Sequence, residues 1–115
     1  MTNCKPVGTP LVPNSHLDMV SRNKIDEFEQ LRVNYCISVG TLSYLSSETR
    51  PDLSHSVSAL SKFLEKPGIE HWRPFLHVLK YLKGTHIMGL THYRSNSETP
   101  VAYSNSNWAN FCITR

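Results

Sequence analysis

The sequence predicts an α+β fold, in which a small bundle of about three helices is followed by a β-hairpin that begins an incomplete sheet. Between residues 25 and 83, apolar residues recur at intervals of three and four, as in amphipathic helices. Prolines and glycines divide this region into separate stretches. From residue 87 the pattern changes to the alternation of apolar and polar residues that is typical of strands.

The first 24 residues are expected to form an extended leader, because Pro6, Pro10 and Pro13 remove backbone donors and disfavour helix before them. A first helix is predicted from Ile25 to about Ser47, and Cys36 is expected to be buried in it. Its apolar stripe consists of Phe28, Leu31, Tyr35, Val39, Leu42 and Leu45.

Gly40 weakens the middle of this helix by about 1 kcal/mol. The pair Arg50-Pro51 ends it, because the proline ring disfavours helical geometry in the preceding residue. A second helix is predicted to begin at Pro51, with Asp52 near the positive end of its dipole, and to stop before residues 66–68. Its apolar face consists of Leu53, Val57, Leu60 and Leu64.

The third helix is predicted over residues 70–83, with Gly84 as its C-cap. Pro74 leaves two possibilities open, since the regular helix either begins at that residue or has a distorted first turn. One side of this helix is apolar and consists of Trp72, Phe75, Leu79 and Leu82. The opposite side is basic and consists of Arg73, His77, Lys80 and Lys83.

Two short strands are predicted at residues 87–93 and 101–104, with the polar stretch 94–99 between them. Two strands are marginal alone, so the hairpin begins a sheet that this chain does not complete. The predicted organisation is therefore a leader at 1–24, a helical region at 25–86 and a sheet-forming segment at 87–115.

Composition restricts the class of protein. The 115 residues, with 39% hydrophobic and 18% charged side chains, suffice for one small folded domain or a piece of a larger one. The three cysteines fit neither a disulfide framework nor paired zinc ligands. No apolar run approaches the length of a membrane span, so an intracellular, soluble protein without membrane contact is expected.

The net charge is +3, and residues 50–115 carry eight basic against four acidic side chains. This surplus permits a polyanionic partner. The basic side of the third helix could contact the phosphates of nucleic acid, and the alternative is a solvated outer face. No metal site is predicted, because His71 and His77, like His86 and His92, are six residues apart. Arg50 and Asp52 are interpreted as a local cap and ion pair.

Several strings of residues together resemble the reverse transcriptase of copia-type retrotransposons, from the end of the polymerase into the ribonuclease H domain. They occur in the family's order over about 110 residues. The strings are CKPVGTPLVPN at 4–14, VGTLSYLSSETRPDLSHSVSALSKFL at 39–64, HWRPFLHVLKYLKGT at 71–85, GL at 89–90 and AYSNSNWAN at 102–110.

The resemblance implies a slice of a Gag-Pol polyprotein whose parent enzyme makes DNA from an RNA template. Residues 25–86 would be thumb-like helices that contact template and primer, and residues 87–115 would begin a ribonuclease H-like sheet. The palm aspartates that hold magnesium in the intact parent would lie upstream. In the family, aspartates usually stand where this chain has Asn105 and Asn107, and the first of them binds metal.

The carboxylates of the chain argue independently against catalysis. The three aspartates, Asp18, Asp26 and Asp52, include no pair that is adjacent or one residue apart. Two-metal chemistry requires several converging anionic oxygens. We therefore expect a non-catalytic fragment with no catalytic residues and no cofactor. Two alternatives stay open, a small basic nucleic-acid-binding helical module and a protein interaction module that self-associates through its open sheet edge.

Overall fold

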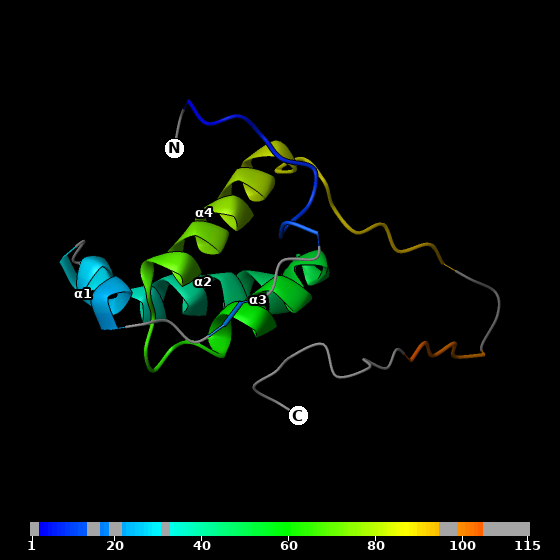
Figure 1. The fold of residues 1–115 in the computed structure, drawn as a ribbon. Coiled ribbons are helices and arrows are strands. Elements are labelled where there is room, and N and C mark those ends of the chain that lie inside the picture. The colour runs from blue at the N-terminus through cyan, green and yellow to red at the C-terminus, as the bar shows by residue number, and fades with distance from the viewer. Residues whose placement is uncertain (1–2, 14–16, 19–21, 31–32, 95–98, 105–115) are drawn as a thin grey trace.

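A computed structural model of the chain describes residues 3–13, 17–18, 22–30, 33–94 and 99–104. In these residues the chain forms a helical body, from which residues 87–94 and 99–104 extend without regular structure (Figure 1). The elements are α1 (Arg22–Gln30), α2 (Tyr35–Glu48), a single 3-10 turn η1 (Pro51–Leu53), α3 (Ser54–Ser61) and α4 (Ile69–Gly84).

The helices pack as two connected pairs around one core. Helix α2 packs against η1 and α3, α1 packs against α4, and α3 also contacts α4. Every helix contributes to this core, and its most buried side chains include Leu53, Leu60 and Val78, which are all fully buried. The remaining members are Phe28, Tyr35, Val39, Leu42, Val57, Phe75 and Tyr81.

The single helix predicted over residues 25–47 is wrong, because two helices occupy that region. Asn34 has an extended backbone, and its side-chain oxygen accepts a hydrogen bond from the backbone N–H of Ile37 at 3.0 Å. An asparagine in this position caps a helix N-terminus by satisfying a donor that the helix leaves unpaired. The helix that follows exposes Cys36, contrary to the expectation that this residue would be buried.

The second and third predicted helices are confirmed with adjusted ends. Leu53, Val57 and Leu60 are buried as predicted, whereas Leu64 lies beyond the last residue of α3 and is 39% exposed. Helix α4 extends one residue past the prediction at both ends. It begins well before Pro74, so the possibility that the helix starts at this proline is wrong.

The C-cap prediction for Gly84 is also wrong. Gly84 is the last residue of α4, and Thr85 follows it as the cap with a negative φ of −119°. The cap N–H bonds to the carbonyl oxygens of Tyr81 and Leu82. The left-handed conformation that favours glycine at a helix C-terminus therefore occurs at neither Gly84 nor Thr85.

The predicted α+β class with a β-hairpin is wrong for the described part of the chain, where residues 87–94 and 99–104 form no strand. These segments have no neighbouring strand, and a strand alone leaves its backbone groups unpaired. Several of their side chains are almost fully exposed, including Ile87, Tyr93 and Tyr103 at 86%, 88% and 94%. No strand edge is thus present in these segments for the self-association expected from a sheet.

Candidate functional site

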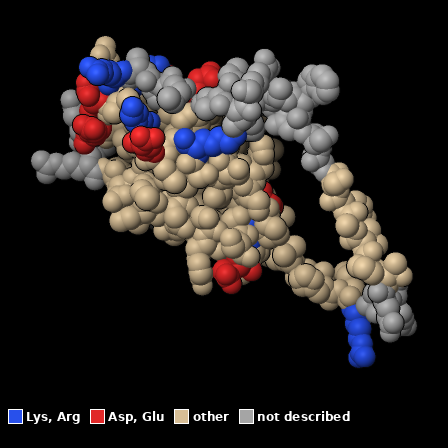
Figure 2. Space-filling view, turned by 90° about the horizontal axis from the view of Figure 1, so that it is seen from below, with Lys and Arg blue, Asp and Glu red and all other residues tan. Residues whose placement is uncertain are grey.

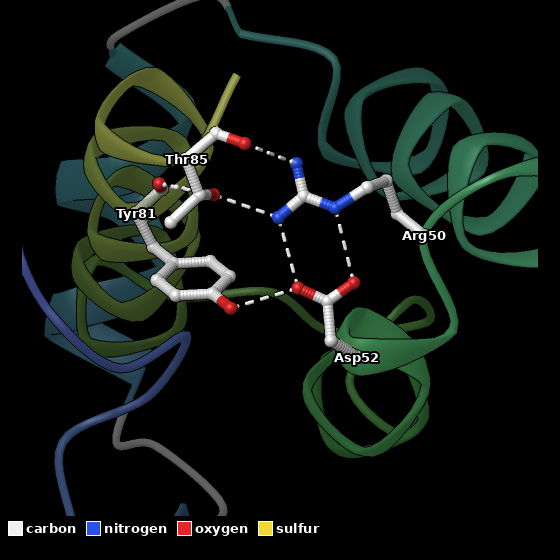
Figure 3. A network of polar contacts seen from close by, with 4 residues as sticks. All are labelled: Arg50, Asp52, Tyr81 and Thr85. Carbon is white, nitrogen blue, oxygen red and sulfur yellow. Dashed lines mark hydrogen bonds and ion pairs between the residues drawn. The ribbon is translucent and has the colours of Figure 1, made fainter. Parts of the chain in front are cut away.

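The C-terminal end of α4 is held by a network of polar side chains around Arg50 (Figure 3). Arg50 lies between α2 and η1 and is only 8% exposed. Its Nε and Nη2 donate to Oδ1 and Oδ2 of Asp52 at 3.0 and 2.8 Å. Its Nη1 and Nη2 also donate to the carbonyl oxygen and Oγ1 of Thr85, at 3.1 and 2.7 Å. One guanidinium group thus joins the turn after α2 to the end of α4.

Tyr81 closes the network from the last turns of α4. Its hydroxyl donates to Oδ2 of Asp52 at 2.8 Å, and its backbone carbonyl accepts from Oγ1 of Thr85 at 2.8 Å. The guanidinium carbon of Arg50 lies 5.7 Å from the centre of the Tyr81 ring. The predicted ion pair of Arg50 and Asp52 is present, and it belongs to a larger contact that fixes the position of α4.

The charges in this network favour the ionised Asp52. Its hydrogen bonds with Arg50 lower the pKa of the carboxyl, and the Tyr81 hydroxyl contributes in the same direction. The same hydrogen bond to Asp52 raises the pKa of Tyr81 and keeps its hydroxyl protonated as a donor. The network is therefore matched in charge, with one cation, one anion and neutral donors.

His71 holds the other end of α4 from inside the core. Its side chain is fully buried and stacks on Phe63 with ring centres 3.9 Å apart. Its Nδ1 accepts from the N–H of Gly68 at 3.0 Å, so its Nε2 is the donor to the carbonyl oxygen of Asp18 at 2.9 Å. Burial lowers the pKa of His71. The ring is thus a neutral structural residue.

The predicted sides of α4 differ from the observed ones. The buried residues of α4 are His71, Phe75, Val78 and Tyr81. Trp72, Leu79 and Leu82 from the predicted apolar side are only half-buried. Trp72 stacks on Phe75 with ring centres 4.6 Å apart, which makes it a packing residue at the edge of the core. Tyr81 is also buried, and its hydroxyl belongs to the Arg50 network described above.

The four residues proposed for nucleic-acid contact lie along one face of α4, at spacings of four, three and three residues. We call Arg73, His77, Lys80 and Lys83 the basic row. Arg73 and Lys83 are exposed, and His77 and Lys80 are half-buried. His77 and Lys83 also contact the N-terminal leader, since their side chains donate to the carbonyl oxygens of Thr9 and Cys4 at 3.0 and 3.2 Å.

Helices α2 and α3 have few charged residues, whereas α1 has two basic and three acidic ones. Helix α2 contains one charged residue, Glu48, and α3 contains none. Figure 2 shows the result on the face seen from below, where acidic and basic side chains gather mainly at one end and the rest is largely uncharged.

Open hollows adjoin the helices in the described part of the chain. One, of about 510 Å³, lies between α1 and the residues around Asn34 and Pro67. Another, of about 600 Å³, lies between the ends of α2 and α4 and residues 88–92. Within the described ranges, no three His, Cys, Asp or Glu side chains come together as metal ligands. Asn105 and Asn107 lie outside the described residues, so the structure does not place them.

Sequence reasoning missed two residues that position the site. The role of His71 was missed because histidine spacing was tested only for metal ligands, although Gly68 three residues earlier is a signal for an N-terminal cap. The contact between Arg50 and Thr85 has no local signal in the sequence, because the two residues are 35 positions apart.

No helix in the part of the chain described here is both long and apolar enough to cross a membrane.

Comparison with known proteins identifies relatives among transposon polyproteins. The sequence is 41% identical over 87 residues to the retrovirus-related Pol polyprotein from transposon TNT 1-94 of Nicotiana tabacum. It is 37% identical over 109 residues to that from transposon RE2 of Arabidopsis thaliana. These matches include 74% and 95% of this chain but only 7% of each polyprotein.

A further relative is an uncharacterized mitochondrial protein of Arabidopsis thaliana, which is 33% identical over 115 residues. That match includes 100% of this chain and 45% of the relative. No family model and no solved structure matches the sequence.

Proposed function

We propose that this chain, a homologue of the Pol polyproteins of plant transposons, is a non-catalytic fragment from the end of a copia-type reverse transcriptase into the start of its ribonuclease H domain. The observation that carries the proposal is the match to the RE2 polyprotein, which includes 95% of this chain and 7% of the relative. The ordered strings between residues 4 and 110 support the more specific location.

In this proposal the described helices serve as a thumb-like unit. The helical region starts with α1 at Arg22, three residues before the boundary predicted at residue 25, so the leader from the polymerase is correspondingly shorter, and residues 87–115 begin the ribonuclease H-like domain. The Arg50 network supports a single helical unit, because it joins the residues of the TRPD string to the end of the KYLKGT string. The two strings thus act together in orienting one helix.

The absence of catalysis follows from the carboxylates in the sequence. Asp18, Asp26 and Asp52 include no closely spaced pair, and Asn105 offers a neutral oxygen where the family usually has a metal-binding aspartate. Two divalent ions about 4 Å apart need several anionic ligands. Magnesium therefore belongs to the intact parent enzyme in this proposal.

The test is an assay of the purified chain for primer extension and for cleavage of an RNA–DNA hybrid, both with magnesium. We expect neither activity. Asn105→Asp restores one carboxylate and serves as the matched variant, which we also expect to be inactive because one carboxylate does not hold two ions. Metal-dependent turnover by the unmodified chain, retained through repeated purification, would overturn the proposal.

A second candidate function is a small basic nucleic-acid-binding module. The observation that favours it is the placement of Arg73, His77, Lys80 and Lys83 on one face of α4. Each phosphate that such a row neutralises releases counterions, so binding weakens as salt rises. The partner would be the backbone of an RNA or DNA template–primer duplex.

Binding of a fluorescein-labelled RNA–DNA hybrid at increasing salt tests this function. For about three phosphate contacts we expect a log–log slope near −3. Lys80→Glu with Lys83→Glu should abolish most of the binding. Lys66→Glu with Arg94→Glu makes the same charge change at exposed positions outside α4 and should have a much smaller effect. Equal losses in both double variants, or a slope near zero, would contradict a specific role for the basic row.

A further inference from the structure

The N-terminal leader lies across the C-terminal part of α4 (Figure 1). Lys83 donates from Nζ to the carbonyl oxygen of Cys4 at 3.2 Å, and His77 donates from Nε2 to that of Thr9 at 3.0 Å. Between these two contacts, Val7 is half-buried against the core, and Leu11 packs there just beyond them. We call residues 4–11 the strap.

Gly84 allows the strap to approach the helix closely. A Cβ atom at Gly84 would lie 2.6 Å from the Cβ atom of Pro6, which is too close without movement of one of the two segments. Gly84 follows Lys80 by four residues and therefore lies on the same face as the basic row. The strap thus crosses this face at its C-terminal end.

The strap occupies donors that a phosphate backbone would use. Its carbonyl oxygens are neutral acceptors, whereas phosphate oxygens are negatively charged, so they add ionic attraction to the Lys83 ammonium and form a charge-assisted hydrogen bond with the ring N–H of His77. The strap contains no helix or strand, so its displacement would break no regular hydrogen-bond ladder. A phosphate backbone is therefore chemically suited to replace it.

We propose that the strap is a built-in competitor of nucleic-acid phosphates for the basic row, so that binding of a duplex backbone requires its displacement. This inference rests on the nucleic-acid contact proposed above. Arg73, which is exposed, provides the first attachment, and His77 and Lys83 join after the strap has moved.

The expected effect follows from the population of the displaced form. If the strap is in place about 90% of the time, the apparent affinity for the duplex is about tenfold lower than without it. Because the bound chain has released its strap in every variant, the number of phosphate contacts, and with it the log–log salt slope, should be the same with and without the strap contacts.

The test uses two strap-release variants that leave the basic row unchanged. Gly84→Ala pushes Pro6 away through its added Cβ atom, and Val7→Ser with Leu11→Ser removes the apolar contacts of the strap. Gly40→Ala is the matched control, because the space around its Cβ position is open. Binding of the labelled RNA–DNA hybrid is measured from about 50 to about 200 mM salt.

We expect both release variants to bind the hybrid about tenfold more tightly than the unmodified chain, with the same salt slope. A synthetic peptide of residues 1–13, added in trans, should reduce this gain. Lys83→Gln in the Gly84→Ala background should reduce it as well. The Gly40→Ala control should bind as the unmodified chain does.

The outcomes separate the strap from the function on which it rests. If the unmodified chain binds the hybrid as tightly as the release variants, competition is refuted while nucleic-acid binding stands. If no variant binds even at low salt, both proposals are refuted. Two release variants of different chemistry, with helical content checked by circular dichroism, guard against a result caused by misfolding of one of them.

Discussion

Arg50 and His71 each join one end of α4 to the rest of the molecule. Arg50 uses four hydrogen bonds to connect Asp52 with Thr85. His71 uses both ring nitrogens to connect Gly68 with Asp18. Both side chains are buried and satisfied, and no buried side-chain polar atom of the described residues lacks a partner. Removal of either group would leave buried polar atoms unpaired.

Arg50→Lys should reduce the free energy of unfolding by about 2 kcal/mol, because one ammonium group cannot make the paired contacts of a planar guanidinium. Because Asp52 is partly exposed, this loss of stability is smaller than that for a fully buried ion pair. Urea denaturation measures the change. Arg73→Lys is the matched control at an exposed position and should change stability by less than about 0.5 kcal/mol. Similar losses in the two variants would contradict the role of the network.

His71 should make stability depend on pH. Burial lowers its pKa in the folded chain below the usual value near 6.5, so the unfolded chain binds more protons between the two values. Stability is therefore fully present above about pH 6.5 and is lost as the pH falls toward the lower, folded pKa.

The measurement is the free energy of unfolding in urea between about pH 7 and pH 5, with His71→Phe as the variant without a titrating ring. This variant loses the hydrogen bonds to Gly68 and Asp18 and is less stable at neutral pH. Its stability should nevertheless change less with pH than that of the unmodified chain. The same pH dependence in both proteins would assign the effect to other groups.

The helices themselves follow their local sequence except where an end is determined by a cap. The periodicity of three and four identifies the helical stretches, and Pro51 and Gly68 separate them. The break before α2 was missed because apolar spacing continues across it from Phe28 to Tyr35. Asn34 carries the signal for the break, since its side chain competes with the helix for backbone donors.

Asn34→Ala should reduce the free energy of unfolding by about 1 kcal/mol, because the N–H of Ile37 loses its side-chain acceptor. Asn34→Ser retains an oxygen that can cap and should lose only a few tenths of a kcal/mol. Thermal denaturation followed by circular dichroism distinguishes the two. An unchanged midpoint in the alanine variant would show that the cap does not stabilise α2.

Gly40→Ala should increase the free energy of unfolding by about 0.5 to 1 kcal/mol, because alanine has the higher helix propensity and its methyl group meets no neighbouring atom. Gly84→Ala makes the same substitution on α4 against Pro6, so we expect no gain there. Urea denaturation of both variants provides the comparison. Equal stabilisation by the two substitutions would mean that Pro6 moves away from Ala at position 84 without a loss of stability.

At the scale of the whole molecule, the chain consists of a helical body and extended segments that contribute little to its core. Met88, Leu90 and Val101 are more than half exposed, in contrast to the buried apolar residues of the helices. The strand prediction at residues 87–93 and 101–104 failed because a strand depends on a neighbour, which local alternation cannot supply. A segment with this alternating pattern forms a strand only when a neighbouring strand is present to pair with it.

Tyr93→Ala and Tyr103→Ala should each change the free energy of unfolding by less than about 0.5 kcal/mol, because both side chains are exposed. Leu60→Ala, at a fully buried position of α3, should reduce it by about 2 to 4 kcal/mol. Urea denaturation under identical conditions gives the three values. A large loss in either tyrosine variant would indicate that its segment packs against the helical body.

The sequence by itself determined the helical character of residues 25–83, the burial of Leu53, Val57 and Leu60 and the relation to transposon Pol polyproteins, because periodicity, proline positions and ordered strings are all read along the chain. The tertiary structure alone decided which residues meet across long separations. Lys83 contacts Cys4 over 79 positions, and His71 contacts Asp18 over 53. Such contacts depend on how the helices pack, and packing is a property of the whole set of side chains that no local pattern contains.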